Sequence, residues 1–145
     1  MSHNMTIRLA RISDAPAIHQ LSTDLGYLYP AEKVAGRIER IMNETKDVLL
    51  VAEAEGCVIG YIHGTPYELL FHDPQVNILA LVVAPAFRGF GVGGQLLDAL
   101  EQWARDNGYS GIRLVSGSER LEAHRFYSNH GYENKKDQKN FSKRL

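Results

Sequence analysis

The sequence has a single cysteine and almost no net charge. Because Cys57 is the only cysteine, an intrachain disulfide and a cysteine-rich metal site are both excluded. Sixteen Lys and Arg against seventeen Asp and Glu give a net charge of -1, so the bulk charge indicates neither nucleic acid nor an anionic membrane as a partner. No stretch approaches the roughly 20 apolar residues of a membrane span, and no signal-peptide pattern is present. We therefore expect a cytoplasmic protein.

Length and composition are those of one ordinary globular domain. The chain has 145 residues, of which 44% are hydrophobic and 23% are charged. A chain of this length buries about two-thirds of the surface that its unfolded form exposes. We expect one domain spanning residues 1–145.

Helices are predicted where apolar residues recur every three to four positions. The clearest helix begins at Val92, with Gly108 placed as a C-terminal glycine. Ser13 is placed as the N-cap of an early helix, which a second helix follows over residues 34–42. A short helix over residues 121–130 completes the set.

Strands are predicted from short apolar or alternating runs. A hairpin turns at Glu55-Gly56, and residues 66–74 are expected to form an irregular connection. The predicted strands are, in chain order, 6–9, 48–54, 58–65, 76–83 and 112–115, with two more after Tyr132. This order is not a regular strand–helix alternation, and it favours an α/β fold with a mixed sheet and helices on both faces.

A glycine-rich segment, Arg88 to Gly94, follows the buried strand and opens the clearest helix. Backbone N–H groups at a helix N-terminus bind phosphate, and glycine lets the backbone approach it closely. A flexible loop without a ligand is the alternative. The segment also fits the dinucleotide pattern Gly-x-Gly-x-x-Gly, but residues 84–87 intervene and the next strand ends without an acid.

Two motifs resemble those of the GNAT superfamily of N-acetyltransferases. Leu81-Val82-Val83-Ala84-Pro85 followed by Arg88-Gly89-Phe90-Gly91-Val92-Gly93 is similar to the family's acetyl-CoA motif, Gln/Arg-x-x-Gly-x-Gly/Ala. Ala123-His124-Arg125-Phe126-Tyr127 with Gly131-Tyr132 resembles its second motif. The order of elements agrees over nearly the whole chain, and the resemblance implies that the strands at Val83 and Ile112 splay apart.

The resemblance also implies residues that hold acetyl-CoA as co-substrate. The pyrophosphate would contact the loop, and the pantetheine arm would contact the main chain of the preceding strand. Arg120 stands where relatives often have Asn, and it is a candidate for contacts to a CoA phosphate, as is Arg125. The full set is Leu81, Val82, Val83, Arg88, Gly89, Phe90, Gly91, Val92, Gly93, Gly94, Arg120 and Arg125.

Acetyl transfer to an amine by direct attack in a ternary complex needs a base, an oxyanion donor and an acid. Tyr127 resembles the family's general acid, and a phenol with a pKa of roughly 10 is protonated at neutral pH. Phe126 would then face the core. A strand N–H near Val82 or Val83 would serve as the oxyanion donor.

The base is not fixed by the sequence. Many relatives carry Glu on the strand before the loop, where this chain has Asn77 and Ala80. Glu68 and Asp73 are the carboxylate candidates, acting through water or by attracting a cation, and a solvated loop is the alternative for both. His63 is a minor candidate.

The acceptor is expected to be a small cationic amine such as a polyamine, an amino sugar or a lysine-like amine. Tyr27, Tyr29, Tyr67 and His72 are its candidate contacts, and no metal is expected. A protein or peptide acceptor remains open, as does a non-catalytic acyl-CoA sensor. The sequence neither requires nor excludes a homodimer, for which the late strands would offer an edge.

Overall fold

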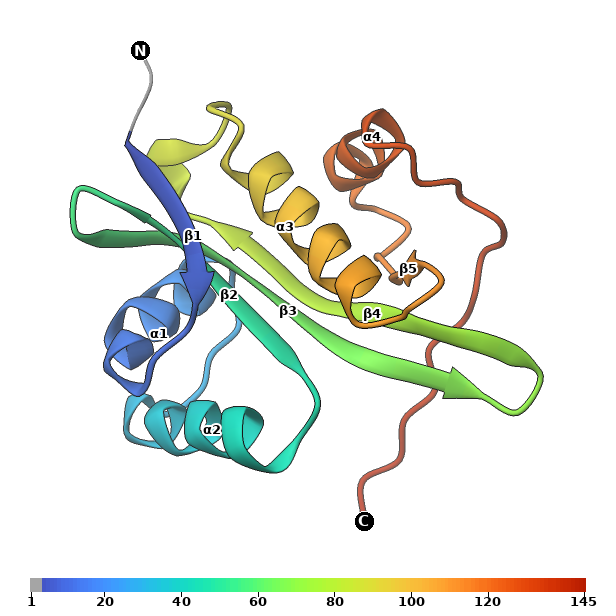
Figure 1. Cartoon of the computed structure of the whole chain (residues 1–145), viewed down its shortest axis with the longest axis horizontal. Helices are drawn as coiled ribbons and strands as arrows, with labels where there is room; N and C mark the ends of the chain where they lie inside the picture. The colour runs from blue at the N-terminus through green and yellow to red at the C-terminus, as the bar shows by residue number, and fades with distance from the viewer. Residues whose placement is uncertain (1–3) are drawn as a thin grey trace. The chain divides into compact units, whose positions relative to one another are not determined.

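The computed structural model describes residues 4–145 (Figure 1). These residues form two compact units, one up to Leu114 and one from Val115 to Leu145. The first unit contains a five-stranded sheet and three helices. Its elements are, in chain order, β1 (Met5–Leu9), α1 (Ala15–Asp24), α2 (Ala31–Glu44), β2 (Val48–Ala54), β3 (Cys57–Leu69), β4 (His72–Val83), α3 (Val92–Asp106) and β5 (Ile112–Arg113).

The strands lie in the order β1-β2-β3-β4-β5. Neighbours are antiparallel except β4 and β5, which are parallel. The predicted mixed α/β sheet is therefore confirmed. The last strand is shorter than predicted, because regular pairing with β4 includes only Ile112 and Arg113.

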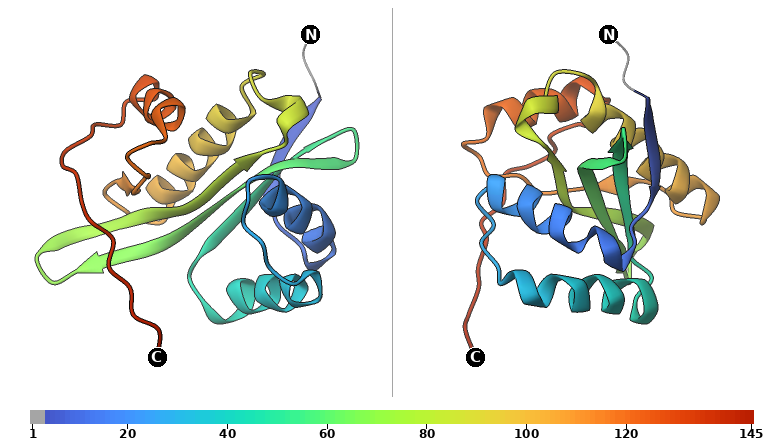
Figure 2. Two further views of the ribbon diagram at one scale, coloured as in Figure 1. Left: turned by 180° about the vertical axis from the view of Figure 1, so that it is seen from behind. Right: turned by 90° about the vertical axis from the view of Figure 1, so that its left-hand side faces the viewer.

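Helices cover both faces of this sheet. Tyr61 on β3 packs in a buried cluster with Ile18 of α1 and Ile38 of α2. The neighbouring Gly60, whose position points to the other face, lies against Leu96 of α3. Figure 2 shows α1 and α2 on one side of the sheet and α3 on the other. The prediction of two helix layers is confirmed, and each buried leucine of α3 contributes about 1.5–3 kcal/mol.

Residues 66–74 are not the irregular connection that was predicted. They continue the hairpin of β3 and β4, which turns at Leu70-Phe71. Pro66 suggested a break because it has no N–H to donate. In the structure Pro66 lies opposite Val76 on β4, and the pairing of β3 with β2 extends only to Gly64, which lies opposite Val48, so no strand on the β2 side requires the missing donor.

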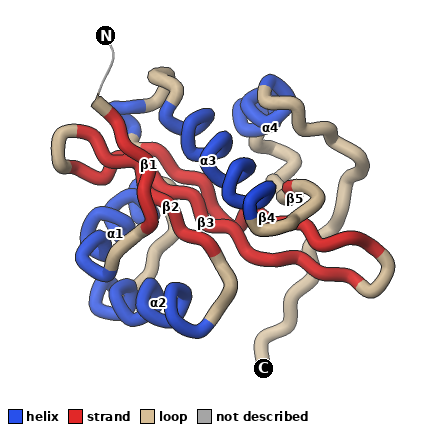
Figure 3. The backbone as a smooth tube through the Cα atoms, viewed as in Figure 1, coloured by secondary structure: helices blue, strands red, loops and turns tan. Residues whose placement is uncertain are grey.

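The second unit contains one helix, α4 (Leu121–Asn129), as predicted to within a residue. The two strands predicted after Tyr132 are wrong, since residues 132–145 form no strand (Figure 3). Residues 133–140 are all polar and lack the apolar alternation of a strand with one buried face. The edge on which dimerisation was expected to depend is therefore not formed by these residues.

The start of α1 differs from the prediction because Asp14, and not Ser13, precedes the helix. Asp14 accepts hydrogen bonds from Arg8 at 2.8 and 2.9 Å and from the Arg11 N–H at 2.8 Å. Arg8 also donates to Glu53 on β2 at 3.0 Å. This largely buried ion pair ties β1 to the start of α1, and the Arg8 guanidinium holds the pKa of the Asp14 carboxyl below its usual range.

We expect Asp14→Asn to lower the free energy of unfolding at pH 7 by about 3 kcal/mol, because it leaves Arg8 without its main counter-ion. The lowered pKa means that this stabilisation is present above about pH 4 and is lost as the pH falls through the folded-state pKa. Urea denaturation at pH 7 and pH 3 measures both effects. Asp98→Asn on the exposed side of α3 is the control, and an equal loss in the two variants would contradict the prediction.

Candidate active site

The sheet opens beside the second half of β4. Pairing with β5 ends at Asn77 and Arg113, whereas β4 continues to Val83. A β-bulge at Leu79 interrupts the register with β3 just beyond this point. From Ile78 onward β4 therefore has β3 on one side and no paired strand among the described residues on the other. The predicted splaying of these two strands is confirmed.

The backbone groups at this open edge follow from the pairing of β3 with β4. The Ala84 N–H donates to Ile59 O at 2.8 Å, and in an antiparallel pair alternate residues direct their N–H and C=O toward the partner strand. Val82 therefore faces β3, while Leu81 and Val83 direct their peptide groups to the open edge. The Arg88 Nε donates to Val83 O at 3.4 Å from that side.

This alternation corrects one expectation. The oxyanion donor was predicted near Val82 or Val83, but the Val82 N–H faces its partner Tyr61. The Val82 side chain is buried in the core with α1 and α2. Only Val83 of these two presents its N–H to the opening.

The glycine-rich segment has the geometry of an anion site. Gly89 and Gly91 have φ of +85° and +83°, which side chains with a Cβ rarely adopt. Gly91 directly precedes α3, and no side chain caps the first turn of that helix. An added Cβ at either glycine would meet no atom within 4 Å. The segment therefore offers amides, a positive helix end and room for a ligand, together with the exposed cation of Arg88.

The open strand edge and the glycine segment are continuous in the chain. A single turn of 3-10 helix, Pro85–Phe87, joins them. Leu81, Val83 and the segment from Arg88 to Gly94 therefore form one continuous set of polar backbone groups. An extended ligand that ends in phosphates fits this set.

The second unit contains the predicted tyrosine. Tyr127 and Phe126 on α4 are both half-buried, and their rings meet edge to face with centroids 5.1 Å apart. The expectation that Phe126 alone is a core residue is wrong, because α4 has no fully buried residue. Arg120 and Arg125 are exposed, and the same unit contains Tyr132, whose ring centroid lies 5.7 Å from that of Tyr127.

The predicted acceptor residues lie on two segments of the first unit. Tyr27 and Tyr29 are exposed in the connection between α1 and α2. Glu68, His72 and Asp73 are exposed near the turn of the β3–β4 hairpin, which belongs to the strands and not to a loop.

Tyr67 was predicted as a wall of the acceptor site, and it has a partner that the sequence did not suggest. The Arg113 guanidinium carbon lies 4.2 Å from the centroid of the Tyr67 ring. Arg113 also donates to Asn77 Oδ1 at 2.6 Å. No spacing in the sequence could reveal this group, because it depends on the register between β4 and β5.

His63 has a carboxylate partner. His63 Nε2 lies 2.9 Å from Asp47 Oδ2, and the Thr65 hydroxyl donates to the other Asp47 oxygen at 2.6 Å. His63 is the cross-strand neighbour of Ala80 on β4. The network fixes the ring on the sheet face that α1 and α2 cover.

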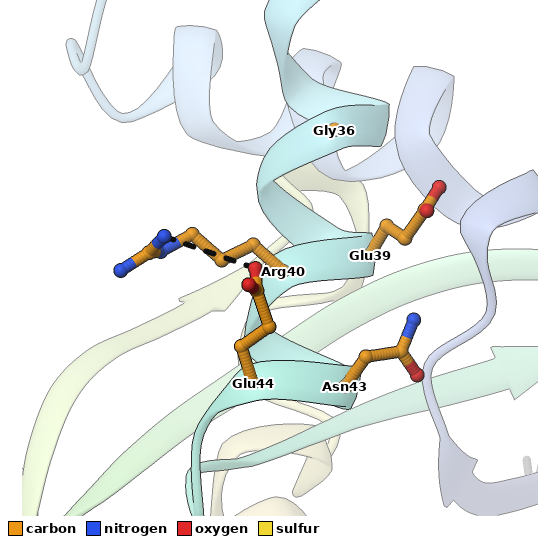
Figure 4. Close-up of a pocket in the computed structure, with 5 residues that line it drawn as sticks. All are labelled: Gly36, Glu39, Arg40, Asn43 and Glu44. Carbon is orange, nitrogen blue, oxygen red and sulfur yellow. Dashed lines mark ion pairs between the residues drawn. The ribbon is translucent and has the colours of Figure 1, made fainter.

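A shallow hollow on α2 is lined by Gly36, Glu39, Arg40, Asn43 and Glu44 (Figure 4). In it Arg40 pairs with Glu44 at 3.7 Å, and neither residue was predicted to bind a ligand. Over residues 4–145, no three His, Cys, Asp or Glu side chains gather to hold a metal ion. In the same range, every helix is too short or too polar to cross a membrane.

Comparison with known proteins identifies relatives over most of the chain. Residues 15–132 match the acetyltransferase (GNAT) family. An uncharacterized N-acetyltransferase, YhfO, of Bacillus subtilis is 31% identical over 134 residues, covering 89% of this chain and 90% of that protein. The aminoalkylphosphonate N-acetyltransferase of Salmonella typhimurium is 37% identical over 86 residues, covering 57% of this chain and 54% of that protein.

A solved structure has the same fold. It is an aminoglycoside N-acetyltransferase, AAC(6')-Iy, in complex with CoA, and its TM-score is 0.88 at 21% sequence identity. The alignment covers 100% of this chain and 98% of that one.

Proposed function

The chain belongs to the GNAT acetyltransferase family, with acetyl-CoA as its co-substrate, and we propose that it acetylates a primary amine of a small cationic metabolite. The observation that carries the proposal is the open edge of β4, which leads through one turn into the glycine segment. The family match runs from residue 15 to residue 132 and so includes parts of both compact units. We therefore treat residues 1–145 as one acetyltransferase domain.

Acetyl-CoA fits the polar backbone groups described above. We assign the pyrophosphate to the amides and the cation of the segment from Arg88 to Gly94. The outward peptide groups of Leu81 and Val83 would pair with the amides of the pantetheine arm, as an added strand would. Arg120 and Arg125 are assigned to outer phosphates because they are exposed cations on the second motif.

The chain also offers groups for the chemical steps. When bound, acetyl-CoA supplies a thioester carbonyl for attack by an uncharged amine and a thiolate that leaves. We assign the outward N–H of Val83 as a donor to the carbonyl oxygen as negative charge develops there. Tyr127 is assigned as the acid that protonates the leaving sulfur.

Removal of the amine's proton is assigned to Glu68 and Asp73. Both are exposed near the hairpin turn. Asp73 precedes Val83, whose N–H is assigned to the thioester oxygen, by ten residues, which is roughly 33 Å along a strand, so it would take up the proton only through a chain of water molecules. The same two carboxylates would attract a protonated amine toward the opening. Tyr27, Tyr29, Tyr67 and His72 would then surround the acceptor.

The acceptor class is supported by chemistry shared among relatives. The curated relative from Salmonella typhimurium acts on an aminoalkylphosphonate, and the CoA complex is of an aminoglycoside N-acetyltransferase. Both names describe small molecules with an amine. A protein or peptide acceptor is the alternative within the enzyme class, and a non-catalytic acyl-CoA sensor is the alternative outside it.

A thiol-release assay with acetyl-CoA tests the proposal. We expect turnover with at least one small amine from a panel of polyamines, amino sugars, aminophosphonates and amino acids, and no turnover with peptides. Calorimetry of acetyl-CoA binding is run beside it. Turnover of peptides alone would favour the protein acceptor, and tight acetyl-CoA binding with no turnover by any acceptor would favour the sensor. Absence of acetyl-CoA binding would refute the proposal.

A further inference from the structure

Arg113 lies where the pairing between β4 and β5 stops and the opening between these strands begins, which we call the closed end of the opening. It lies in the last residue pair that joins β4 to β5, opposite Asn77. Its guanidinium donates to Asn77 Oδ1 at 2.6 Å and stacks on the Tyr67 ring at 4.2 Å. All three side chains are half-buried. The guanidinium is therefore fixed by two neutral neighbours from two other strands.

The charge of Arg113 is not balanced by these neighbours. The other half-buried arginine of the sheet, Arg8, is paired with two carboxylates at 2.8 and 3.0 Å. Within residues 4–114, Arg113 makes no ion pair with a carboxylate. Burying part of a cation without a counter-ion costs free energy, because the charge loses hydration. Guanidinium groups form bidentate hydrogen bonds with carboxylate and phosphate oxygens. The site is thus complementary to an anionic group from a ligand.

The position of Arg113 indicates which ligand supplies that group. The expected CoA contacts, Leu81, Val83 and the glycine segment, lie toward the end of β4, whereas Asn77 and Arg113 lie at the opposite, closed end. Tyr67, on which the guanidinium stacks, is already a predicted acceptor contact. The anion is therefore expected from the acceptor and not from the phosphates of CoA.

We propose that Arg113 binds an anionic group of the acceptor, so that the substrate is an amine that also carries a carboxylate, phosphonate or phosphate. This inference rests on the proposed function and revises its acceptor class from a cationic metabolite to an amine that also carries an anionic group. Leu81 lies four residues beyond Asn77, roughly 13 Å along the strand, so several bonds should separate the amine from the anion. Arg113 is a specificity-determining residue in this account and takes no part in the chemical step.

Direct binding of matched probes tests this inference independently of turnover. The probes are 6-aminohexanoate and 1,6-diaminohexane, which have similar length and differ in one end group, and they are titrated into the whole protein saturated with CoA. We expect 6-aminohexanoate to bind at least tenfold more tightly to the wild type. Arg113→Gln keeps a donor for Asn77 but removes the charge, and it should abolish the preference. Arg113→Lys should retain part of it.

Arg40→Gln on the exposed side of α2 is the matched control and should keep the full preference. Equal binding of the two probes, no binding of either, or a preference that survives Arg113→Gln would overturn the inference. Thermal melts and acetyl-CoA titrations of each variant check that the fold is intact, and the wild-type preference stands as a test without any variant.

If 6-aminohexanoate binds through Arg113 and neither it nor any other amine is acetylated, the proposed function fails while the anion site stands. If amines are acetylated without regard to an acid group, only the inference fails.

Discussion

Replacing Tyr127 by Phe should lower kcat about 100-fold while leaving the affinity for acetyl-CoA within about twofold of the wild type. The change removes one hydroxyl and keeps the ring, so the edge-to-face contact with Phe126 at 5.1 Å is preserved. A loss confined to kcat is what removal of a general acid predicts, because the acid acts on the leaving sulfur and not on the bound ground state. Thiol release measures kcat, and calorimetry measures the affinity.

Tyr132→Phe is the matched control for this experiment. Its ring centroid lies 5.7 Å from that of Tyr127 in the same unit, and it is likewise half-buried. It should retain at least half of the wild-type kcat. If Tyr127→Phe keeps kcat within threefold of the wild type, or if both variants lose it equally, Tyr127 is not the acid and the leaving thiolate is protonated by solvent or by another group.

The parts of the fold that the sequence predicted are those with local signals. The helix from Val92 was predictable because its buried leucines repeat at helical spacing and a glycine follows its end. The glycine segment was predictable because its residue types are required by the backbone that they adopt. Gly89 and Gly91 do have positive φ, as an anion loop at a helix N-terminus requires.

The parts that it did not predict depend on pairing between distant residues. Pro66 looked like a strand break until the register showed that no neighbouring strand lies on its donor side. The Arg113 site depends on a two-residue pairing between β4 and β5, which no local pattern encodes. Asp14 and not Ser13 precedes α1, and its carboxylate accepts hydrogen bonds from Arg8, six residues earlier, in place of capping the helix. Long-range strand pairing decided the first two cases.

The tail shows where the prediction departed from the residue pattern. Two strands were expected from Tyr132 onward, although residues 133–140 are all polar. A strand with no apolar side chains has nothing to bury against a helix or a second sheet. The residue pattern of the tail therefore argues against strands, whereas at the glycine segment the residue pattern and the resemblance agreed.

Replacing Gly91 by Ala should raise the dissociation constant for acetyl-CoA at least tenfold. Gly91 has φ of +83° at the position just before α3. An L-residue in that conformation costs about 1–2 kcal/mol, and the backbone relieves the strain by rotating the amides that would face the phosphates. The added methyl meets no protein atom within 4 Å, so the fold survives and the loss falls on the ligand. Calorimetry with acetyl-CoA measures the change.

Gly36→Ala provides the control, because Gly36 lies within α2, also has open space at its Cβ and lacks a positive φ. That substitution should leave the affinity unchanged and stabilise the protein by about 0.5–1 kcal/mol, since alanine favours a helix over glycine. Comparing the two variants distinguishes a general effect of replacing glycine by alanine from the specific effect of replacing Gly91. Wild-type affinity in Gly91→Ala would mean that the phosphates bind away from the start of α3, and the assignment of the segment from Arg88 to Gly94 would then be wrong.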